Sequence, residues 1–263
     1  MLPILFQDEN LIAIHKPSDL LVHRTSLDAY ETRFAVQLLR DQIGQHVYPA
    51  HRLDKATSGV LLFGLNPAAA RALSMQFAAR EVHKQYLAIV RGWPAEAGHI
   101  DHPLELRKDD VELFGDEVPK GAQESQTEYR RLATIELPWT VDKYPSSRYA
   151  LVELNPLTGR RHQIRRHLKH ISHPIIGDST YGKGNHNRAF AQAFGINRLL
   201  LACQSMNFPH PISGERITVT APLAADFSRV VNELNWLDAL NQHHIVYETP
   251  RAPDANNRRQ IFV

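Results

Sequence analysis

The sequence contains a single cysteine and no long apolar run, and each absence narrows the class of protein. Cys203 alone cannot form an internal disulfide or a multi-cysteine zinc site, which fits a reducing compartment. Because Cys203 lies in the apolar run 199–206, we interpret it as a small core residue rather than a nucleophile. No stretch of about 18 apolar residues is present, and Asp8 and Glu9 interrupt residues 1–15, so we expect no membrane span, no secretory leader and a cytoplasmic location.

The sequence also lacks internal repeats and any glycine-rich loop of the kind that binds dinucleotides or phosphates. His167, His170 and His173 have a spacing that two metal ligands on one helical turn could use. However, Pro174 follows at once and no carboxylate is near in the sequence. We therefore expect neither a metal nor a cofactor. With 43% hydrophobic and 22% charged residues among 263, the composition is typical of a globular protein with one large domain or two lobes.

Positive charge is concentrated rather than abundant. The formal net charge is only +2, which by itself does not indicate a nucleic-acid partner. Residues 160–173, however, contain five lysines or arginines, four histidines and no acidic residue, whereas residues 109–117 are acidic. Such asymmetry can form a binding surface for a polyanion on a nearly neutral protein. The alternative is a solvated basic face of a helix.

Hydrophobic periodicity and turn residues predict a mixed α+β fold, because strands and helices do not alternate strictly. Thr32 is the expected cap of one helix, and Asn66 with Pro67 is the expected start of another. Residues 92–124 are expected to form a hairpin or a loop insertion. The expected strands are 4–7, 11–14, 60–63, 83–91, 125–137, 148–154, 199–208 and 216–219, and the expected helices are 32–43, 67–81, 160–171, 187–194 and 223–240. We place one domain at 1–245 and a loosely ordered tail at 246–263.

A charged turn precedes one of the apolar strands. Residues 51–59 read HRLDKATSG, and an apolar segment follows them directly. Asp54 therefore lies on the loop that enters a core strand, and loops held by a rigid sheet often carry catalytic groups. Such an aspartate can be a nucleophile, or it can merely accept hydrogen bonds from Thr57 or Ser58 in a solvated turn.

A second segment could supply the partner of this aspartate. Residues 159–167 read GRRHQIRRH, in which Arg161 and Arg165 are four apart and would share one face of a helix. Arg165 could approach Asp54. An arginine within about 4 to 6 Å typically lowers the pKa of an aspartate by about 1 to 3 units, which would keep the carboxylate ionised even when partly buried.

The order of four motifs resembles that of the RluA-type pseudouridine synthases. The motifs are HRLD with TSG in residues 51–59, KQY in 84–86, GRRHQIR in 159–165 and HPIIGD in 173–178. The resemblance extends over roughly residues 1–220. It implies a mainly antiparallel sheet flanked by helices, with a catalytic cleft between two lobes. We expect no N-terminal S4-type RNA-binding domain in this chain. The resemblance also implies an isomerisation without a cofactor, in which the bond from ribose to uracil N1 is broken and the base is rejoined through C5.

The resemblance assigns roles to individual residues. Asp54 would be the nucleophile, Arg165 its ion-pair partner and Tyr86 the aromatic residue stacked on the target uracil. Asp54 would attack the base or the sugar, or assist the departure of uracil, and the sequence leaves these routes open. Base flipping and RNA binding are expected of five further residues: His51, Arg52, Arg160, Arg161 and Arg166.

Within this family, segments 40–47, 88–93 and 148–154 are most similar to those of enzymes that modify uridine 65 in the T stem of tRNA. The expected partner is therefore tRNA, bound by a monomer. One alternative is a family member that acts on 23S rRNA, and another is a noncatalytic RNA-binding protein or chaperone. Two positions depart from the family pattern: Asp19 replaces a common glycine, and Ala202 replaces a usual histidine.

Overall fold

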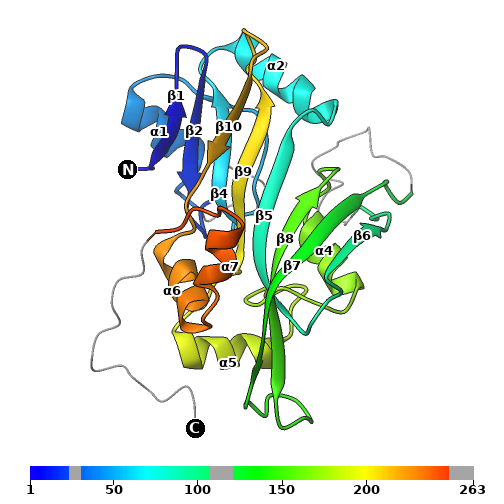
Figure 1. Ribbon diagram of the computed structural model, residues 1–263. Coiled ribbons are helices and arrows are strands. Elements are labelled where there is room, and N and C mark those ends of the chain that lie inside the picture. Colours follow the sequence, from blue (N-terminus) through cyan, green and yellow to red (C-terminus); the bar gives the residue numbers. More distant parts are fainter. Residues whose placement is uncertain (24–30, 107–120, 249–263) are drawn as a thin grey trace.

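The computed structural model describes residues 1–23, 31–106 and 121–248, and within them the chain forms one sheet of ten strands (Figure 1). The strands are β1 (Ile4–Gln7), β2 (Leu11–Lys16), β3 (Tyr48–Pro49), β4 (Ser58–Gly64), β5 (His83–Arg91), β6 (Ala97–Asp101), β7 (Gln126–Leu137), β8 (Ser147–Pro156), β9 (Leu201–Pro209) and β10 (Arg216–Thr220). Their order is β1-β2-β4-β9-β5-β8-β7-β6, with β10 paired to β9 and β3 to β4. Only the β4–β9 pairing is parallel among these described strands, so the mainly antiparallel α+β class is confirmed.

Helices cover both faces of the sheet (Figure 1). They are α1 (Ala35–Ile43), α2 (Pro67–Ala78), α4 (Gln163–His170), α5 (Gly184–Phe194), α6 (Ala225–Glu233) and α7 (Leu237–Gln242). Buried residues of α1, α2 and α4 pack in one hydrophobic cluster. Those of α5, α6 and α7 pack in a second cluster on the opposite face. None of the helices in the described part of the chain is both long and apolar enough to cross a bilayer.

Side-chain alternation along the central strands decides what faces each cluster. Along β5, Tyr86 and Ala88 belong to the first cluster, whereas Leu87 and Ile89 belong to the second. On β9, Cys203 belongs to the first cluster and Ala202 to the second. The candidate site described below therefore lies on the face covered by α1, α2 and α4.

All eight expected strands are present, but several helix starts were wrong, and α5 begins at Gly184 rather than at Asn187. Helix α1 begins at Ala35, and Phe34 rather than Thr32 precedes it without a side-chain cap. The backbone amides of Ala35 and Val36 instead donate to the carbonyls of residues 21 and 22 in the preceding loop. By contrast, the Asn66 cap is confirmed, because its side chain accepts a hydrogen bond of 2.9 Å from the amide of residue 69.

Helix α4 begins at Gln163 rather than at Arg160, so Arg161 precedes the helix and does not share a helical face with Arg165. The Gln163 side-chain oxygen accepts hydrogen bonds from the Thr158 hydroxyl at 2.7 Å and from the Arg160 amide at 3.0 Å. These contacts hold residues 158–162 in a turn. The helix starts only where that turn ends.

The region expected as one helix at 223–240 is two helices, α6 and α7, because Asn235 adopts a left-handed backbone between them (φ 58°). In the expected insertion 92–124, β6 forms and pairs with β7, and the acidic segment 109–117 lies outside the described residues. Residues 246–248 were assigned to the tail, yet Val246 and Glu248 hydrogen-bond with Leu223. The remainder of that segment, 249–263, lies outside the described residues.

Candidate active site

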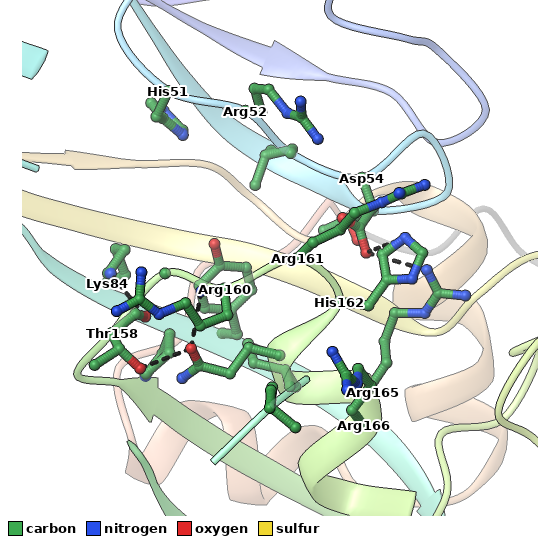
Figure 2. A pocket seen from close by; sticks show the side chains of 18 of the residues that line it. His51, Arg52, Asp54, Lys84, Thr158, Arg160, Arg161, His162, Arg165 and Arg166 are labelled. Carbon is green, nitrogen blue, oxygen red and sulfur yellow. Dashed lines mark hydrogen bonds and ion pairs between the residues drawn. The ribbon is translucent and has the colours of Figure 1, made fainter. Parts of the chain in front are cut away.

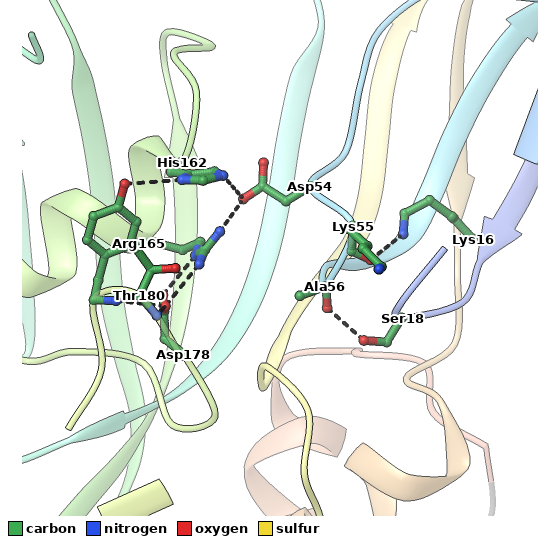
Figure 3. Close-up of polar contacts among 10 residues, drawn as sticks. Lys16, Ser18, Asp54, Lys55, Ala56, His162, Arg165, Asp178 and Thr180 are labelled. Atoms are coloured by element: carbon green, nitrogen blue, oxygen red, sulfur yellow. Dashed lines mark hydrogen bonds and ion pairs between the residues drawn. The ribbon is translucent and has the colours of Figure 1, made fainter. Parts of the chain in front are cut away.

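Asp54 lies on the loop that joins β3 to β4, as the sequence predicts, and neighbouring segments hold this loop by its carbonyl groups (Figure 3). The carbonyl of Asp54 itself accepts a hydrogen bond of 3.0 Å from the Thr57 amide. The Lys16 ammonium donates to the Lys55 carbonyl at 3.0 Å, and the Ser18 hydroxyl donates to the Ala56 carbonyl at 2.8 Å. The backbone on the carboxyl side of Asp54 is thus fixed at successive residues.

Lys16 is a fully buried cation at the end of β2. Besides the Lys55 carbonyl, its ammonium donates to the carbonyls of Pro17 at 2.9 Å and Leu20 at 2.8 Å, so all three donors have partners. Burial lowers the pKa of Lys16 to about 7, while the charge of Asp54 acts in the opposite direction. In the loop that follows β2, Asp19 has a left-handed backbone (φ 61°), which explains why glycine suits this position.

The Asp54 carboxylate meets Arg165 on the first turn of α4, as predicted. Arg165 Nη1 donates to Asp54 Oδ2 at 3.1 Å. The other side of the same guanidinium donates to Asp178, with Nε at 2.8 Å from Oδ2 and Nη2 at 2.9 Å from Oδ1. Asp178 Oδ1 also accepts hydrogen bonds from the backbone amides of Thr180 and Tyr181, both at 2.9 Å. Arg165 is therefore clamped by one carboxylate while it contacts the other.

Burial shapes the electrostatics of this cluster. The Asp178 side chain is fully buried, the Arg165 side chain is 7% exposed, and the Asp54 side chain is 24% exposed. Burial by itself would raise the pKa of Asp178, but the hydrogen bonds and charge of Arg165 lower it below its ordinary value. Burial would likewise lower the pKa of Arg165, yet Asp178 and Asp54 together raise it. The guanidinium therefore stays charged, and Asp54 is the carboxylate of the cluster that solvent or a ligand can reach.

His162 approaches Asp54 from the turn before α4. Its Nε2 lies 3.8 Å from Asp54 Oδ2, and its Nδ1 lies 3.1 Å from the Tyr181 hydroxyl (Figure 3). The residue has a left-handed backbone (φ 54°), which is uncommon outside glycine and asparagine. This conformation turns the ring toward the carboxylate instead of along the helix.

Tyr86 lies on the first-cluster face of β5, where it lines the same pocket as Asp54. The register of the β5–β9 pairing shifts between Gln85 and Tyr86, and such irregularities redirect side chains next to functional sites. Burial raises the pKa of Tyr86 well above its ordinary value, and neighbouring Cys203 and Asp54 act in the same direction. The phenol is therefore neutral.

The pocket has a volume of about 690 Å³ and lies between the β3–β4 loop, β5 and the segment that joins β8 to α4 (Figure 2). Among the described residues that line it, seven are lysine or arginine and two are acidic. The cations are Arg52, Arg80, Lys84, Arg160, Arg161, Arg165 and Arg166, and the acids are Asp54 and Glu105. The wall is thus strongly positive around the partly exposed Asp54 carboxylate, which suits a polyanionic ligand.

All eight predicted site residues line this pocket, but their local settings differ. Arg160 donates from Nε to the Glu124 carbonyl at 3.1 Å. His51 Nε2 accepts a hydrogen bond of 3.1 Å from the Leu62 amide, and its ring stacks on Phe77. Burial lowers the pKa of His51 to about 3, so the ring is neutral and supports β4. The cationic group beside it in the loop is Arg52.

The three histidines that were weighed as metal ligands make separate contacts. His167 Nδ1 lies 2.9 Å from the Thr127 hydroxyl, and its Nε2 lies 3.1 Å from the His102 carbonyl. His173 Nδ1 lies 2.9 Å from a backbone carbonyl on β5, and His170 stacks on the His102 ring. In the described ranges, no three histidine, cysteine or acidic side chains are grouped as a metal ion would require.

The positions of Cys203 and Ala202 follow the alternation of side chains along β9. Cys203 is buried behind Tyr86, which confirms it as a core residue, and burial raises its pKa to about 12. Ala202 faces the second cluster on the other side of the sheet and does not line the pocket. The replacement of the usual histidine there changes the core instead of the pocket wall.

No separate role was predicted for Asp178, His162 or Lys84, although all three lie within the motifs that carry the resemblance. Asp178 follows Gly177 directly, and a carboxylate after a tight turn was the available signal. His162 is placed by its left-handed backbone, which periodicity does not reveal. Lys84 precedes Tyr86 by two residues, so strand alternation alone could have placed both on one face.

Comparison with known proteins agrees with this geometry. The family described as RNA pseudouridylate synthase matches residues 10–170. Proteins named tRNA pseudouridine synthase C from Haemophilus ducreyi and Pasteurella multocida are 50% and 48% identical to the chain, over 89% of it and 96% and 97% of their own lengths. The solved structure of human RNA pseudouridylate synthase domain containing 1 is 26% identical, with a TM-score of 0.65 over 84% of this chain and 83% of that one.

Proposed function

The chain belongs to the family of RNA pseudouridylate synthases, and from this premise we propose that it converts uridine 65 in the T stem of tRNA to pseudouridine. The observation that carries the proposal is the partly exposed Asp54 carboxylate, held by Arg165 in a pocket that also contains Tyr86. The tRNA substrate is supported by the names of relatives 43–50% identical to the chain. Those names favour tRNA over the 23S rRNA alternative.

The chemistry assigns separate tasks to the three groups. The bond between ribose C1′ and uracil N1 breaks, the base turns, C1′ bonds to C5, and the proton leaves C5 while N1 gains one. Asp54 acts on the sugar or the base, and Arg165 orients its carboxylate through a hydrogen bond of 3.1 Å. Tyr86 offers a neutral ring against which a flipped uracil can stack. A noncatalytic RNA-binding protein would have no need of this carboxylate arrangement.

Access to a paired uridine requires base flipping, which costs a few kcal/mol. Arg52 on the Asp54 loop, together with Arg160, Arg161 and Arg166, supplies cations at the pocket wall that can contact phosphates and offset this cost. A tRNA substrate supports a cytoplasmic location.

The proposal is tested with Asp54→Asn. We expect this variant to lose pseudouridine formation completely while it retains tRNA binding, because the phosphate contacts remain. Turnover is measured by tritium release from tRNA labelled at uridine C5, and binding by filter retention. Asp41→Asn is the matched control, since Asp41 is exposed on α1 and pairs only with Arg40 among described residues. Full turnover by Asp54→Asn would disprove the assigned mechanism.

The substrate is tested by mapping pseudouridine in tRNA and 23S rRNA from cells with and without the gene. We expect loss of the modification at tRNA position 65 alone. Loss in 23S rRNA with tRNA unchanged would establish the alternative substrate. Unchanged maps in both RNAs, with no turnover by the purified protein, would favour a noncatalytic RNA-binding protein.

A further inference from the structure

Lys84 lies at the end of the pocket away from Asp54. Figure 2 shows it beside Thr158 and Arg160, whereas Asp54, His162 and Arg165 lie at the opposite side. Strand alternation puts Lys84 on the same face of β5 as Tyr86. The ammonium is therefore presented to the cavity that would hold the flipped uridine, but at a distance from the reacting carboxylate.

The Lys84 ammonium has few hydrogen-bond partners among the described residues. Its only hydrogen bond among the described residues is a long one of 3.4 Å to the Thr158 carbonyl, and none of their carboxylates forms an ion pair with it. Lys16 provides the contrast, because its three donors contact three carbonyls at 2.8–3.0 Å. Burial lowers the pKa of Lys84 from its ordinary value. A half-buried cation with so few partners is stabilised when an anion binds beside it.

The surroundings of Lys84 favour an anionic ligand over a neutral base. Arg160 and Arg80 line the same part of the pocket. Glu124 approaches them: its carboxylate pairs with Arg80 at 2.9 Å, and its backbone carbonyl accepts a hydrogen bond from Arg160. The charge of Arg160 also acts on the Glu124 carboxylate, but among the described residues neither Arg160 nor Lys84 forms an ion pair with a carboxylate. In RNA, the group that carries negative charge is the phosphodiester.

We propose that Lys84, with Arg160 beside it, forms a phosphodiester-binding subsite that holds the RNA strand next to the flipped nucleotide. This inference rests on the proposed function, since it takes RNA as the ligand. Lys84 acts on binding and positioning, while Asp54 carries the chemistry. Because β5 carries both Lys84 and Tyr86, a phosphate held by Lys84 would fix the distance between the RNA backbone and the stacked uracil.

The first test measures binding of a T-arm stem-loop RNA by the full chain carrying Asp54→Asn, which holds the substrate unconverted. Adding Lys84→Gln should weaken binding about tenfold at low salt, as expected for loss of one charge-assisted contact. The slope of log K against log salt should fall by about 0.7 to 0.9, the value for one phosphate. Lys84→Arg should retain most of the affinity, and Lys143→Gln, at an exposed turn, should change neither quantity.

The second test identifies the ligand atom. Stem-loops are prepared with one neutral methylphosphonate linkage on either side of the target uridine. At one of the two linkages, the methylphosphonate should lower the affinity of the protein that contains Lys84. It should not lower the affinity of the Lys84→Gln variant any further, because the contact is already lost, as in a double-mutant cycle. If the losses of binding free energy from the methylphosphonate and from Lys84→Gln add fully at both linkages, the subsite is overturned. An unchanged slope of log K against log salt for Lys84→Gln would also overturn it, as would a loss of folding by Lys84→Arg. Absence of any pseudouridine formation by the unmodified chain would instead disprove the proposed function.

Discussion

At the scale of single residues, two buried groups of opposite charge, Lys16 and Asp178, serve the same purpose beside Asp54. Lys16 is fully buried with all its donors satisfied, and one of its contacts ends on the residue next to Asp54. Asp178 is fully buried with its oxygens occupied by Arg165 and backbone amides. Both residues therefore hold the groups that flank Asp54, whereas Asp54 itself retains an exposed edge. Among the side chains of Lys16, Asp178 and Asp54, that of Asp54 is the least buried, because the other two residues hold the groups that position it.

We expect Lys16→Met to destabilise the protein by about 2 to 5 kcal/mol, because the substitution leaves three carbonyl groups without their donor. The free energy of unfolding is measured in urea. Activity should also fall in the fraction that remains folded, since the Lys55 carbonyl beside Asp54 is released. Lys143→Met, at an exposed turn, serves as the control and should change stability by less than about 0.5 kcal/mol. Equal stability of the two variants would contradict this role of Lys16.

The order of the motifs predicts Asp54, Tyr86 and Arg165 as site residues, and the structure brings all three to one pocket. The groups that hold them were not predicted. Asp178 lies 13 positions from Arg165 in the sequence, and Lys55 lies 39 positions from Lys16. Such contacts depend on how the loops pack after the sheet has formed. No local spacing encodes them, so they were visible only in the fold.

At the scale of elements, the site depends on the parallel contact between β4 and β9. This pairing involves Ser58 and Gly59 on β4, directly after the Asp54 loop, with Ala202 and Cys203 on β9. Gly59 has φ +116°, and a Cβ atom there would overlap the Cys203 carbonyl. Glycine is therefore required both by the backbone angle and by the approach of the neighbouring strand.

We expect Gly59→Ala to lower the free energy of unfolding by more than about 3 kcal/mol, because the strands must separate locally to admit the methyl group. Thermal and urea unfolding provide the measurement. The matched control is Gly44→Ala, which also introduces a side chain at positive φ (+68°) but into open space. That variant should cost only about 1 to 2 kcal/mol, the strain of the left-handed backbone. If the two substitutions cost the same, close strand packing is not what fixes the Asp54 loop.

Strands were easier to predict than helix ends for a physical reason. The expected strand 83–91 has the same bounds as β5, and its residues 86–90 are all buried because helices cover both faces of the sheet. The start of α4 depends instead on a hydrogen bond between Thr158 and Gln163, and the start of α1 on backbone carbonyls of residues 21 and 22. Those partners come from tertiary structure. The sequence therefore predicted the approximate position of these two helices but not the residues at which they begin.

At the scale of the whole molecule, buried histidines couple folding to pH. Burial lowers the pKa of His51 to about 3 and that of His167 to about 4. In the unfolded chain, each imidazole takes up a proton below about pH 6.5. Between that pH and the folded-state values, the unfolded state binds more protons than the native state. Stability is therefore fully present at neutral pH and is lost as the pH falls.

We expect the free energy of unfolding to fall between about pH 6.5 and 4, with each of these histidines contributing at most about 1.4 kcal/mol per pH unit. Urea unfolding at a series of pH values measures the slope. His167→Gln should be less stable than the parent at pH 7, because it disturbs the contacts with Thr127 and the His102 carbonyl, and its slope should be shallower. His99→Gln, on the exposed side of β6, should reproduce the parent slope. A slope that His167→Gln leaves unchanged would place the acid sensitivity of the fold elsewhere than in this imidazole.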